Sequence, residues 1–461
     1  MKLLLINPPQ SAVYGKIGSP DYPPLGLAYI GAVLEKQGHY VRIIDIDAEK
    51  ISKQHLLKII RNFEIIGITA TTPTFQQAEK LFKLIKENTK AITLLGGVHA
   101  TITPEDCLKT DLIDFVIRGE GELTIVELLD AIEKKKQISS IKGISYKKNN
   151  KIIHNKDREL IQNLDDIPFP ARHLFNQQKY TYPDSLLNPV MPIMTSRGCP
   201  HMCTYCCTKL IFSRRVRFRS AKNVVDEIQQ LIRDYKVKEI HFWDDNFTLN
   251  KQRVFEILAE IKKRKIKLKF AFPNGLRVDQ VDEEILRALK EMGVYSVAFG
   301  VESGNQIILN NVKKGTTIEK IEKAYKLAKK LKIETWGFFM LGLYGENKKT
   351  IRDTINFAKK LNPDIAKFHI LKPYPGTEIF DQLKKDGLII EFDYSKYGIH
   401  TPPVHRLNDI TPDELIDLSK KAYREFYLRP SKIIQQITRI KSFQRFKLNL
   451  KTGINVLKMI K

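Results

Sequence analysis

Short β-branched runs alternate with amphipathic segments over the first third of the chain, and this alternation restricts the fold more than any other feature. Period-two or continuous short apolar runs predict strands, whereas a 3.6-residue repeat predicts helices. The predicted strands are Lys2–Ile6, Tyr40–Ile44, Ile65–Thr69, Ala91–Leu95 and Phe115–Ile117, and the predicted helices are Leu25–Lys36, His55–Asn62, Phe75–Lys86 and Glu122–Lys134. Alternating strands and helices indicate a parallel sheet, so residues 1–135 are predicted to form a Rossmann-like, doubly wound α/β domain.

The loops that follow these strands carry small and polar residues. They are Asn7-Pro8-Pro9, Thr69–Thr74, Gly96–Thr101 and Arg118–Glu122. Ligands of doubly wound sheets bind beyond the carboxyl ends of the strands, and glycines let a backbone approach a ligand closely. The sequence has no GxGxxG motif, which argues against a nicotinamide dinucleotide. We therefore expect a broad, flat pocket for another ligand.

The alternation resumes after a connector at residues 136–188, which includes a predicted hairpin around Asn149-Asn150 and a proline-rich link at Ile167–Pro170. Six strand and helix units predict a partial (β/α)6 barrel over residues 189–390, with its active site at the strand carboxyl ends. Residues 391–461 form a C-terminal extension, predicted to be helical. The predicted barrel strands are Val190–Met194, Glu239–Trp243, Leu268–Phe272, Val294–Val301, Thr335–Met340 and Ile365–Leu371.

Four of the five cysteines lie within the nine residues from Cys199 to Cys207. Such clustering indicates metal ligation in a reducing compartment rather than a disulfide framework. Cys199, Cys203 and Cys206 have the spacing CxxxCxxC, and a 4Fe-4S cube held by three thiolates keeps one iron open for chemistry. A closed structural zinc site is the alternative, with His201 or Cys207 as a fourth ligand. The single loop argues against it, because zinc ribbons draw ligands from two separated pairs.

This motif at the opening of a predicted barrel resembles the radical S-adenosylmethionine superfamily. The resemblance covers about residues 190–390, and Cys199, Cys203 and Cys206 match the cluster ligands one for one. It implies that the open iron binds S-adenosylmethionine and that an electron from the cluster breaks the C5′–S bond. The resulting 5′-deoxyadenosyl radical then abstracts hydrogen from an unactivated carbon, while the protein positions the reacting atoms.

Further resemblances to this superfamily lie at the ends of later strands. Asp244 and Asp245 match the segment near the methionine amino group, and Glu302 and Ser303 match the ribose-binding segment. Gly342 and Gly345 match the stretch that passes the adenine. Each has an ordinary alternative, as a helix cap, a salt bridge or a turn. Their occurrence in order after successive strands favours a shared S-adenosylmethionine site.

The whole arrangement resembles the cobalamin-binding branch of the superfamily, which includes class B methyltransferases and the anaerobic magnesium-protoporphyrin monomethyl ester cyclases. This resemblance implies cobalamin as a third cofactor, held by the strand-end loops of residues 1–135. The DxHxxG motif that supplies a cobalt-ligating histidine in related domains is absent, and a structural role is preferred for His99. The expected cobalamin-binding residues are Asn7, Pro8, Thr71, Gly96, Gly97, His99, Gly119 and Glu120.

Three functions remain open from the sequence. The leading hypothesis is a cobalamin-dependent enzyme that methylates an unactivated carbon of a small-molecule or lipid-like substrate. The second is an oxidation, cyclisation, ring contraction or C–C coupling on a lipid or tetrapyrrole-like substrate by the same machinery. The third is a noncatalytic metal- or cobalamin-binding protein. The first two also need a reducing electron donor, such as flavodoxin or ferredoxin.

The formal net charge of +25 favours an acidic partner or reflects compositional bias. Residues 429–461 carry nine Lys or Arg and no Asp or Glu, with apolar residues at helical spacing. This stretch is predicted either to lie on an anionic membrane or to pack on the barrel with a solvated basic face. Binding to anionic vesicles would separate the two. No signal peptide, membrane span or nucleic-acid recognition module is found, so we expect a cytoplasmic protein that does not bind nucleic acid.

Overall fold

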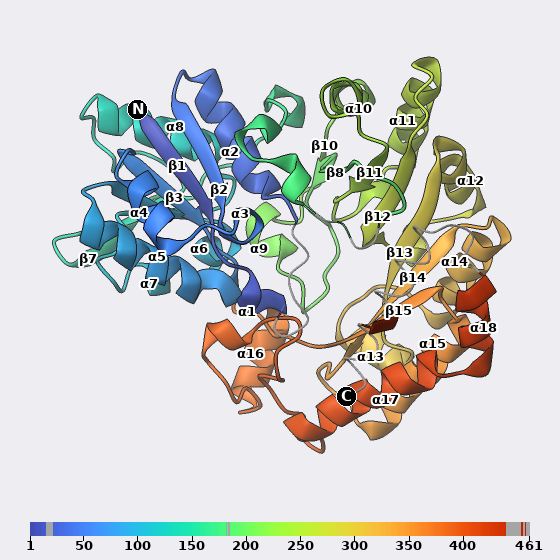
Figure 1. Cartoon of the computed structure of the whole chain (residues 1–461). Coiled ribbons are helices and arrows are strands. Elements are labelled where there is room, and N and C mark those ends of the chain that lie inside the picture. Colours follow the sequence, from blue (N-terminus) through green and yellow to red (C-terminus); the bar gives the residue numbers. More distant parts are fainter. Residues whose placement is uncertain (15–21, 181, 183–184, 439–452, 455–456, 458–461) are drawn as a thin grey trace.

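The computed structural model describes residues 1–14, 22–180, 182, 185–438, 453, 454 and 457, and the statements below concern these residues. Two sheets dominate the molecule, one in each half of the chain (Figure 1). The fold is α/β, as the sequence predicts. The boundaries of the four predicted segments, 1–135, 136–188, 189–390 and 391–461, stay a prediction.

The first sheet has the strand order β2-β1-β3-β4-β5-β6-β7, with parallel pairing from β2 to β5. Leu3 and Leu5 point into a core beneath α2 (Leu25–Lys36) and α8 (Gly121–Glu133). Leu4 and Ile6 point into a second core beneath α4 (Lys53–Ile60) and α5 (Phe75–Asn88). Helices therefore cover both faces of the sheet, which confirms the doubly wound prediction. The strands are β1 (Lys2–Asn7), β2 (Tyr40–Asp45), β3 (Ile65–Thr69), β4 (Ile92–Gly96), β5 (Phe115–Ile117), β6 (Ile144–Lys148) and β7 (Lys151–His154).

The helices of this half lie close to their predicted positions. The predicted helix His55–Asn62 begins two residues earlier, because Ser52 caps it by accepting a hydrogen bond from His55 N. The helices are α1 (Ser11–Tyr14), α2 (Leu25–Lys36), α3 (Ile46–Glu49), α4 (Lys53–Ile60), α5 (Phe75–Asn88), α6 (Val98–Ile102), α7 (Pro104–Cys107) and α8 (Gly121–Glu133).

The predicted hairpin is confirmed as β6 and β7. Asn149 and Asn150 both have positive φ, at 51° and 59°, as a type I′ turn requires. Because β6 pairs antiparallel with β5, the hairpin extends the first sheet instead of standing apart in the connector.

The second sheet has six parallel strands in the order β15-β14-β13-β12-β11-β8. This sequential order of strand and helix units is that of the predicted partial barrel. The strands are β8 (Val190–Ile193), β11 (Glu239–Phe242), β12 (Lys269–Leu276), β13 (Val294–Glu302), β14 (Glu334–Leu341) and β15 (Ile365–Ile370).

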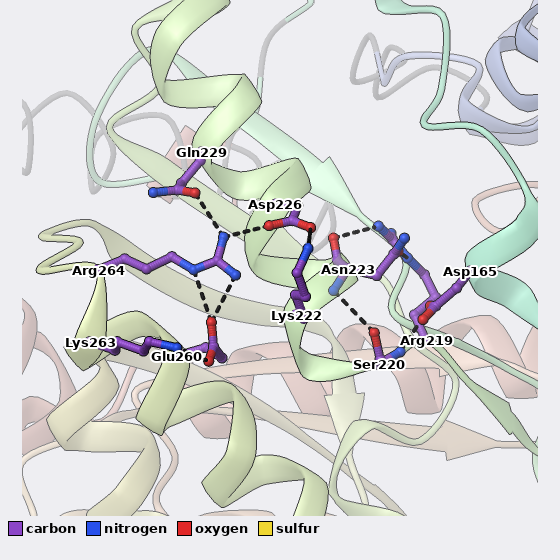
Figure 2. A network of polar contacts seen from close by, with 10 residues as sticks. All are labelled: Asp165, Arg219, Ser220, Lys222, Asn223, Asp226, Gln229, Glu260, Lys263 and Arg264. Atoms are coloured by element: carbon purple, nitrogen blue, oxygen red, sulfur yellow. Dashed lines mark hydrogen bonds and ion pairs between the residues drawn. The ribbon is translucent and has the colours of Figure 1, made fainter.

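One face of this sheet is covered by helices that share a large apolar core with it. Arg264 ties two of them together, since it pairs with Asp226 of α10 at 2.6 Å and with Glu260 of α11 at 2.7 Å (Figure 2). The helices of this half are α9 (Thr208–Phe212), α10 (Ala221–Tyr235), α11 (Lys251–Lys263), α12 (Glu283–Met292), α13 (Gln306–Asn311), α14 (Ile318–Lys330), α15 (Lys348–Leu361), α16 (Glu378–Lys385), α17 (Pro412–Tyr427) and α18 (Pro430–Thr438).

The C-terminal extension connects the two halves. Asp393 Oδ1 accepts a hydrogen bond from Gln76 Nε2 at 2.6 Å, and Ile399 N donates to Val13 O at 2.8 Å. Residues 391–405 therefore contact the first domain as well as the barrel.

The helix α18 packs on the barrel. Lys432 is only 1% exposed, and its Nζ donates to Pro363 O in the loop before β15, while Gln436 Nε2 donates to Asp364 O at 2.8 Å. These contacts involve one side of α18, since Ile433 and Ile434 are exposed. Most of the remaining basic stretch lies outside the described residues, and the membrane alternative stays a prediction. Among the described residues, no helix has the length and apolar character needed to cross a bilayer.

Candidate active site

The loop of residues 198–207, here called the cysteine loop, begins at a position that only glycine fits. It lies between β9 (Ser196–Arg197) and β10 (Arg217–Phe218), which pair antiparallel. Gly198 has a φ of 95°, and a Cβ there would lie 2.4 Å from the carbonyl oxygen of Arg215. Any side chain would collide with this backbone, so the entry to the loop is fixed sterically.

Backbone hydrogen bonds then anchor the middle of the cysteine loop. Thr204 N donates to Val312 O at 3.1 Å, and Thr204 O accepts from Ile379 N at 3.1 Å. Cys206 N donates to Cys203 O at 3.2 Å, which folds the last part of the loop back. The loop is thereby held between the end of α13 and the start of α16.

Cys199, Cys203 and Cys206 lie together on this loop, close enough for their thiols to interact electrostatically. Arg277, directly after β12, is 7% exposed and places Nη1 3.9 Å from Cys203 Sγ. No three His, Cys, Asp or Glu side chains of the described chain converge on a point where they could share one metal ion. The cysteines of an iron–sulfur cube each bind a different iron and need not converge in that way.

Asp244, at the carboxyl end of β11, supports the segment that leads into the cysteine loop. Its Oδ1 accepts hydrogen bonds from Thr195 N at 3.1 Å, from Thr195 Oγ1 at 2.7 Å and from Ser196 Oγ at 2.5 Å. Burial raises the pKa of Asp244. Asp245 is exposed and accepts a hydrogen bond from Thr208 Oγ1 at 3.3 Å. Of the two aspartates, Asp245 is therefore the one that faces outward beside the cysteines.

The next residue, Asn246, is 1% exposed, and neither its Oδ1 nor its Nδ2 has a hydrogen-bond partner. A buried polar atom without a partner costs about 1–3 kcal/mol. A polar group from outside the protein would satisfy both atoms. Asn246 is therefore a candidate contact for a polar ligand beside Asp245.

Glu302 ends β13 with a φ of 65°, a left-handed conformation that costs a non-glycine residue about 1–3 kcal/mol. Its Oε1 accepts from Lys314 Nζ at 2.7 Å, and the same Nζ lies 3.3 Å from Tyr205 OH. A Cβ at Gly300 would lie 2.6 Å from Glu302 Oε1, so glycine there leaves room for the ion pair. Lys314 therefore connects the predicted ribose-binding carboxylate to the cysteine loop.

The remaining barrel residues of the predicted S-adenosylmethionine site shape its walls. Ser303 is fully buried, with its Oγ 3.1 Å from Thr354 Oγ1. Gly342 has a φ of 83°, and its N–H donates to Glu346 Oε2 at 2.7 Å. Gly345 has a φ of 84° and closes the same turn. These residues fix the backbone after β13 and β14.

A cavity of about 370 Å³ lies between the two halves of the molecule. Five of the predicted cobalamin-binding residues line its wall on the first domain, and Met194, Arg197, Ile211 and Phe212 line the barrel side. A Cβ at Gly96 or Gly119 would meet no atom within 4 Å, so the missing side chains leave open space. The five predicted lining residues are Thr71, Gly96, Gly97, Gly119 and Glu120.

Asn7, Pro8 and His99 do not line this cavity. Asn7 Nδ2 donates to the buried Asp45 Oδ2 at 2.8 Å. His99 is fully buried, its ring lies 4.3 Å from that of Phe75, and desolvation lowers its pKa to about 4. These surroundings are typical of a neutral histidine in a protein core. A structural role of this kind is the one that the sequence analysis preferred for His99.

Four buried side chains, here called the interdomain ion-pair network, join the cavity to the cysteine loop. Arg197 pairs with Glu120 at 2.8 Å and with Glu122 at 2.5 Å, while Arg217 pairs with Glu120 at 2.6 Å. Burial raises the pKa of Glu120, but the hydrogen bond from Arg217 and the charge of Arg197 outweigh it and lower the pKa. Because Arg197 directly precedes Gly198, the network holds the backbone at the entry to the cysteine loop against the first domain.

Sequence reasoning assigns no role to Arg277 or Lys314. Arg277 follows a predicted barrel strand by a few residues, and a charged residue at a strand end is a signal that could have found it. Lys314 lies in no recognisable pattern. Its role depends on the pairing with Glu302, which only the folded chain brings about.

Residues 193–358 match the family model of the radical SAM superfamily, and residues 13–129 match that of the B12 binding domain. An uncharacterised methyltransferase of Pyrococcus horikoshii is 39% identical over 441 residues, which cover 95% of each chain. The chain belongs to the radical S-adenosylmethionine superfamily. It is an enzyme, and its cofactors are a 4Fe-4S cluster, S-adenosylmethionine and cobalamin.

Two further similarities agree with this assignment. The anaerobic magnesium-protoporphyrin IX monomethyl ester cyclase of Cereibacter sphaeroides is 30% identical, over 93% of this chain and 71% of its own. The structure of the radical S-adenosylmethionine methyltransferase TsrM from Kitasatospora setae superposes with a TM-score of 0.74 at 17% identity, covering 99% of this chain and 98% of that one. That likeness shows the same fold.

The residues present fit all three cofactors. The cysteine loop offers three soft thiolate donors and no fourth ligand in the CxxxCxxC motif, as a cube with an open iron requires. The unpartnered amide of Asn246 offers a donor and an acceptor to a polar ligand beside it. The glycine-lined wall of the cavity offers an open surface against which one face of a flat ligand can lie.

We expect Gly96→Leu to abolish cobalamin binding while the iron content stays at the wild-type level. A Cβ at Gly96 has open space around it, so a leucine side chain extends into the cavity without disturbing the sheet. Cobalt and iron analysis of the reconstituted protein measures both. Stoichiometric cobalt in this variant would show that cobalamin binds elsewhere.

Proposed function

We propose that this enzyme transfers a methyl group to an unactivated carbon of a small-molecule substrate. The observation that carries the proposal is the position of the glycine-lined cavity, whose barrel side includes Arg197, one residue before the cysteine loop begins. A cobalamin in this cavity would lie next to the site of radical formation. The similarity to a methyltransferase over nearly the whole chain supports the same reaction.

When bound, S-adenosylmethionine supplies a sulfonium whose C–S bond can be cleaved by reduction, and cobalamin supplies a carrier for the methyl group. The overall reaction consumes two S-adenosylmethionine molecules and two electrons for each substrate C–H bond that becomes C–CH3. The products besides the methylated substrate are S-adenosylhomocysteine, methionine and 5′-deoxyadenosine, and the hydrogen removed from the substrate is retained in 5′-deoxyadenosine. Superfamily members act on small molecules and need a reductant, and we propose a flavodoxin- or ferredoxin-type donor.

The chain's own residues position these groups. We propose that Cys199, Cys203 and Cys206 hold the cluster and that Arg277 places a positive charge beside it. Asp245, Asn246 and Glu302 lie at successive strand ends and offer hydrogen bonds to S-adenosylmethionine. Asp244, Ser303, Gly342 and Gly345 position the backbone around it.

Cyclisation or another oxidative outcome is the second candidate, and the similarity to the anaerobic cyclase favours it. The same barrel residues would serve both reactions, because both begin with hydrogen abstraction. The two differ in the fate of the methyl group.

Methyl-labelled S-adenosylmethionine distinguishes them. Reduced holoenzyme is incubated anaerobically with the labelled compound and a small-molecule extract of the source cells, and the products are analysed by mass spectrometry. We expect a product that carries the label, with S-adenosylhomocysteine and 5′-deoxyadenosine formed in equal amounts. Turnover that yields 5′-deoxyadenosine without S-adenosylhomocysteine would refute methyl transfer and support the oxidative alternative.

Contact between a membrane and the residues beyond Thr438 remains a second, separate proposal. Its support is the basic, amphipathic sequence of that stretch.

A further inference from the structure

The inner face of strands β14 and β15 carries an unusual combination of aromatic and basic side chains. Phe339 of β14 and Phe368 of β15 belong to the large core beneath the covering helices. Since side chains alternate along a strand, Phe338 and Lys367 point to the opposite, inner face. Phe338 and Lys367 are register partners, as are Met340 and His369 one step closer to the carboxyl ends.

Lys367 lies over two aromatic rings on this face. Its Nζ is 4.8 Å from the centre of the Trp336 ring and 5.7 Å from that of Phe338. Within the described part of the chain, Lys367 has no carboxylate partner. The acid on the same face of β14, Glu334, accepts a hydrogen bond from Trp336 Nε1 at 3.1 Å. Glu302, at the end of the neighbouring strand, is paired with Lys314.

Two histidines lie beside Lys367. The rings of His369 and His400 are 5.8 Å apart, and His369 Nδ1 is buried without a hydrogen-bond partner. Desolvation and the charge of Lys367 lower the pKa of His369 to about 3 and that of His400 to about 4. Both imidazoles are therefore neutral at pH 7, and each can donate one N–H to an acceptor.

A fourth basic residue completes this group, here called the basic inner face: Lys367, His369, His400 and Lys372. Lys372 is 7% exposed, and its Nζ donates to Thr401 O at 3.0 Å and to other oxygens of residues 396–402. The neighbouring groups whose charges lower the pKa values of His369 and His400 are all lysines or imidazoles. Desolvation alone lowers the pKa of Lys372, to about 7. The fold thus places the charged Lys367 beside a buried imidazole nitrogen of His369 that has no hydrogen-bond partner, and no carboxylate of the described residues pairs with Lys367.

We propose that the basic inner face binds an anionic group of the substrate, a carboxylate or a phosphate, with an apolar part of the substrate resting on Trp336 and Phe338. An anionic oxygen would accept from Lys367 Nζ and from an imidazole N–H, which satisfies the buried nitrogen of His369. The rings would contact a flat or aliphatic body at the same time. The proposed anion site deepens the proposed function, because it names the chemical class of the substrate. It rests on the proposed function only in taking the bound anion to be part of the molecule that is methylated.

The test measures binding without turnover, so that its failure and the failure of methyl transfer can be told apart. Reconstituted holoenzyme is titrated calorimetrically under anaerobic conditions with three probes: 1-naphthoate, 1-naphthyl phosphate and the uncharged 1-methoxynaphthalene. We expect at least one anion to bind on the order of tenfold or more tightly than the uncharged probe, since a hydrogen bond to a charged group is lost without it. The anion that binds more tightly shows whether the anionic group of the substrate is a carboxylate or a phosphate.

Lys367→Met should reduce that preference by about tenfold or more, and Lys367→Arg should retain most of it because the charge remains. Lys384→Met, which removes an exposed lysine on α16, serves as the matched control and should bind like the wild type. His369→Phe keeps a ring of similar volume and tests the unsatisfied nitrogen separately.

Equal binding of charged and uncharged probes, or an anion preference that survives Lys367→Met, would overturn the proposal. A loss of affinity for S-adenosylmethionine in Lys367→Met, with anion binding unchanged, would overturn it as well. That result would assign the basic inner face to the carboxylate of the cofactor.

Discussion

Cys199→Ala, Cys203→Ala and Cys206→Ala are each expected to purify and reconstitute with almost no iron, compared with about four irons per chain in the wild type. Each thiol binds its own iron, so removal of one leaves the cube with two protein ligands. Because the cysteine loop is anchored by backbone hydrogen bonds of Thr204 and Cys206, the loss reflects ligation rather than misplacement of the loop. Iron and sulfide analysis with the visible spectrum measures the effect.

Two cysteines provide the controls. Cys207 lies on the cysteine loop but outside the motif, and Cys107 is fully buried in a core of the first domain. Cys207→Ala and Cys107→Ala should keep the full iron content. A complete cluster in any of the three motif variants, or loss of iron in Cys207→Ala, would mean that the ligand set is wrong.

Glu120→Ala is expected to destabilise the protein by about 3–5 kcal/mol, because it leaves two buried arginines without a shared partner. Arg197 and Arg217 are 9% and 6% exposed at their side chains, and Glu120 itself is 2% exposed. Chemical denaturation followed by circular dichroism measures the change in the free energy of unfolding. The same variant should lose cobalamin more readily, since the network closes one wall of the cavity.

The matched control is Glu159→Ala, which removes a carboxylate paired with Lys142 but 67% exposed. It should leave the free energy of unfolding almost unchanged, because water screens the exposed pair. The pKa of Glu120 is lowered in the folded state, so its contribution is present above the pKa of an unfolded glutamate, about 4.3. That contribution is lost as the pH falls through the folded pKa. A stability difference between wild type and Glu120→Ala that grew on acidification would contradict this account.

Much of the fold can be read from local pattern. The strands of both sheets were predictable because their apolar runs reflect burial on one or both faces, and the hairpin because Asn149 and Asn150 tolerate positive φ. The three cysteines were equally visible, since ligands on one short loop need no tertiary contact to be recognised. By contrast, the sequence gives no sign that the hairpin extends the first sheet, because pairing partners are chosen in space.

The candidate site shows where sequence reasoning stops. Glu120 was predicted from its loop as a cobalamin-binding residue, and in the fold it lines the cavity while pairing with two arginines of the barrel. His99 lies in a strand-end loop, yet it points into the core against Phe75. A loop position predicts proximity to a site, whereas the direction of the side chain depends on what packs around it.

The sequence by itself therefore determined the two α/β halves and the order of the strand-end segments, and it predicted the cluster ligands, because periodicity and ligand spacing are local properties of the chain. The tertiary structure alone decided which of those residues meet. It joined Glu120 to Arg197 across 77 positions and placed Lys367, His369 and His400 together with no described carboxylate paired to Lys367. Charge pairing and desolvation act between neighbours in space, so their consequences appear only once the chain is folded.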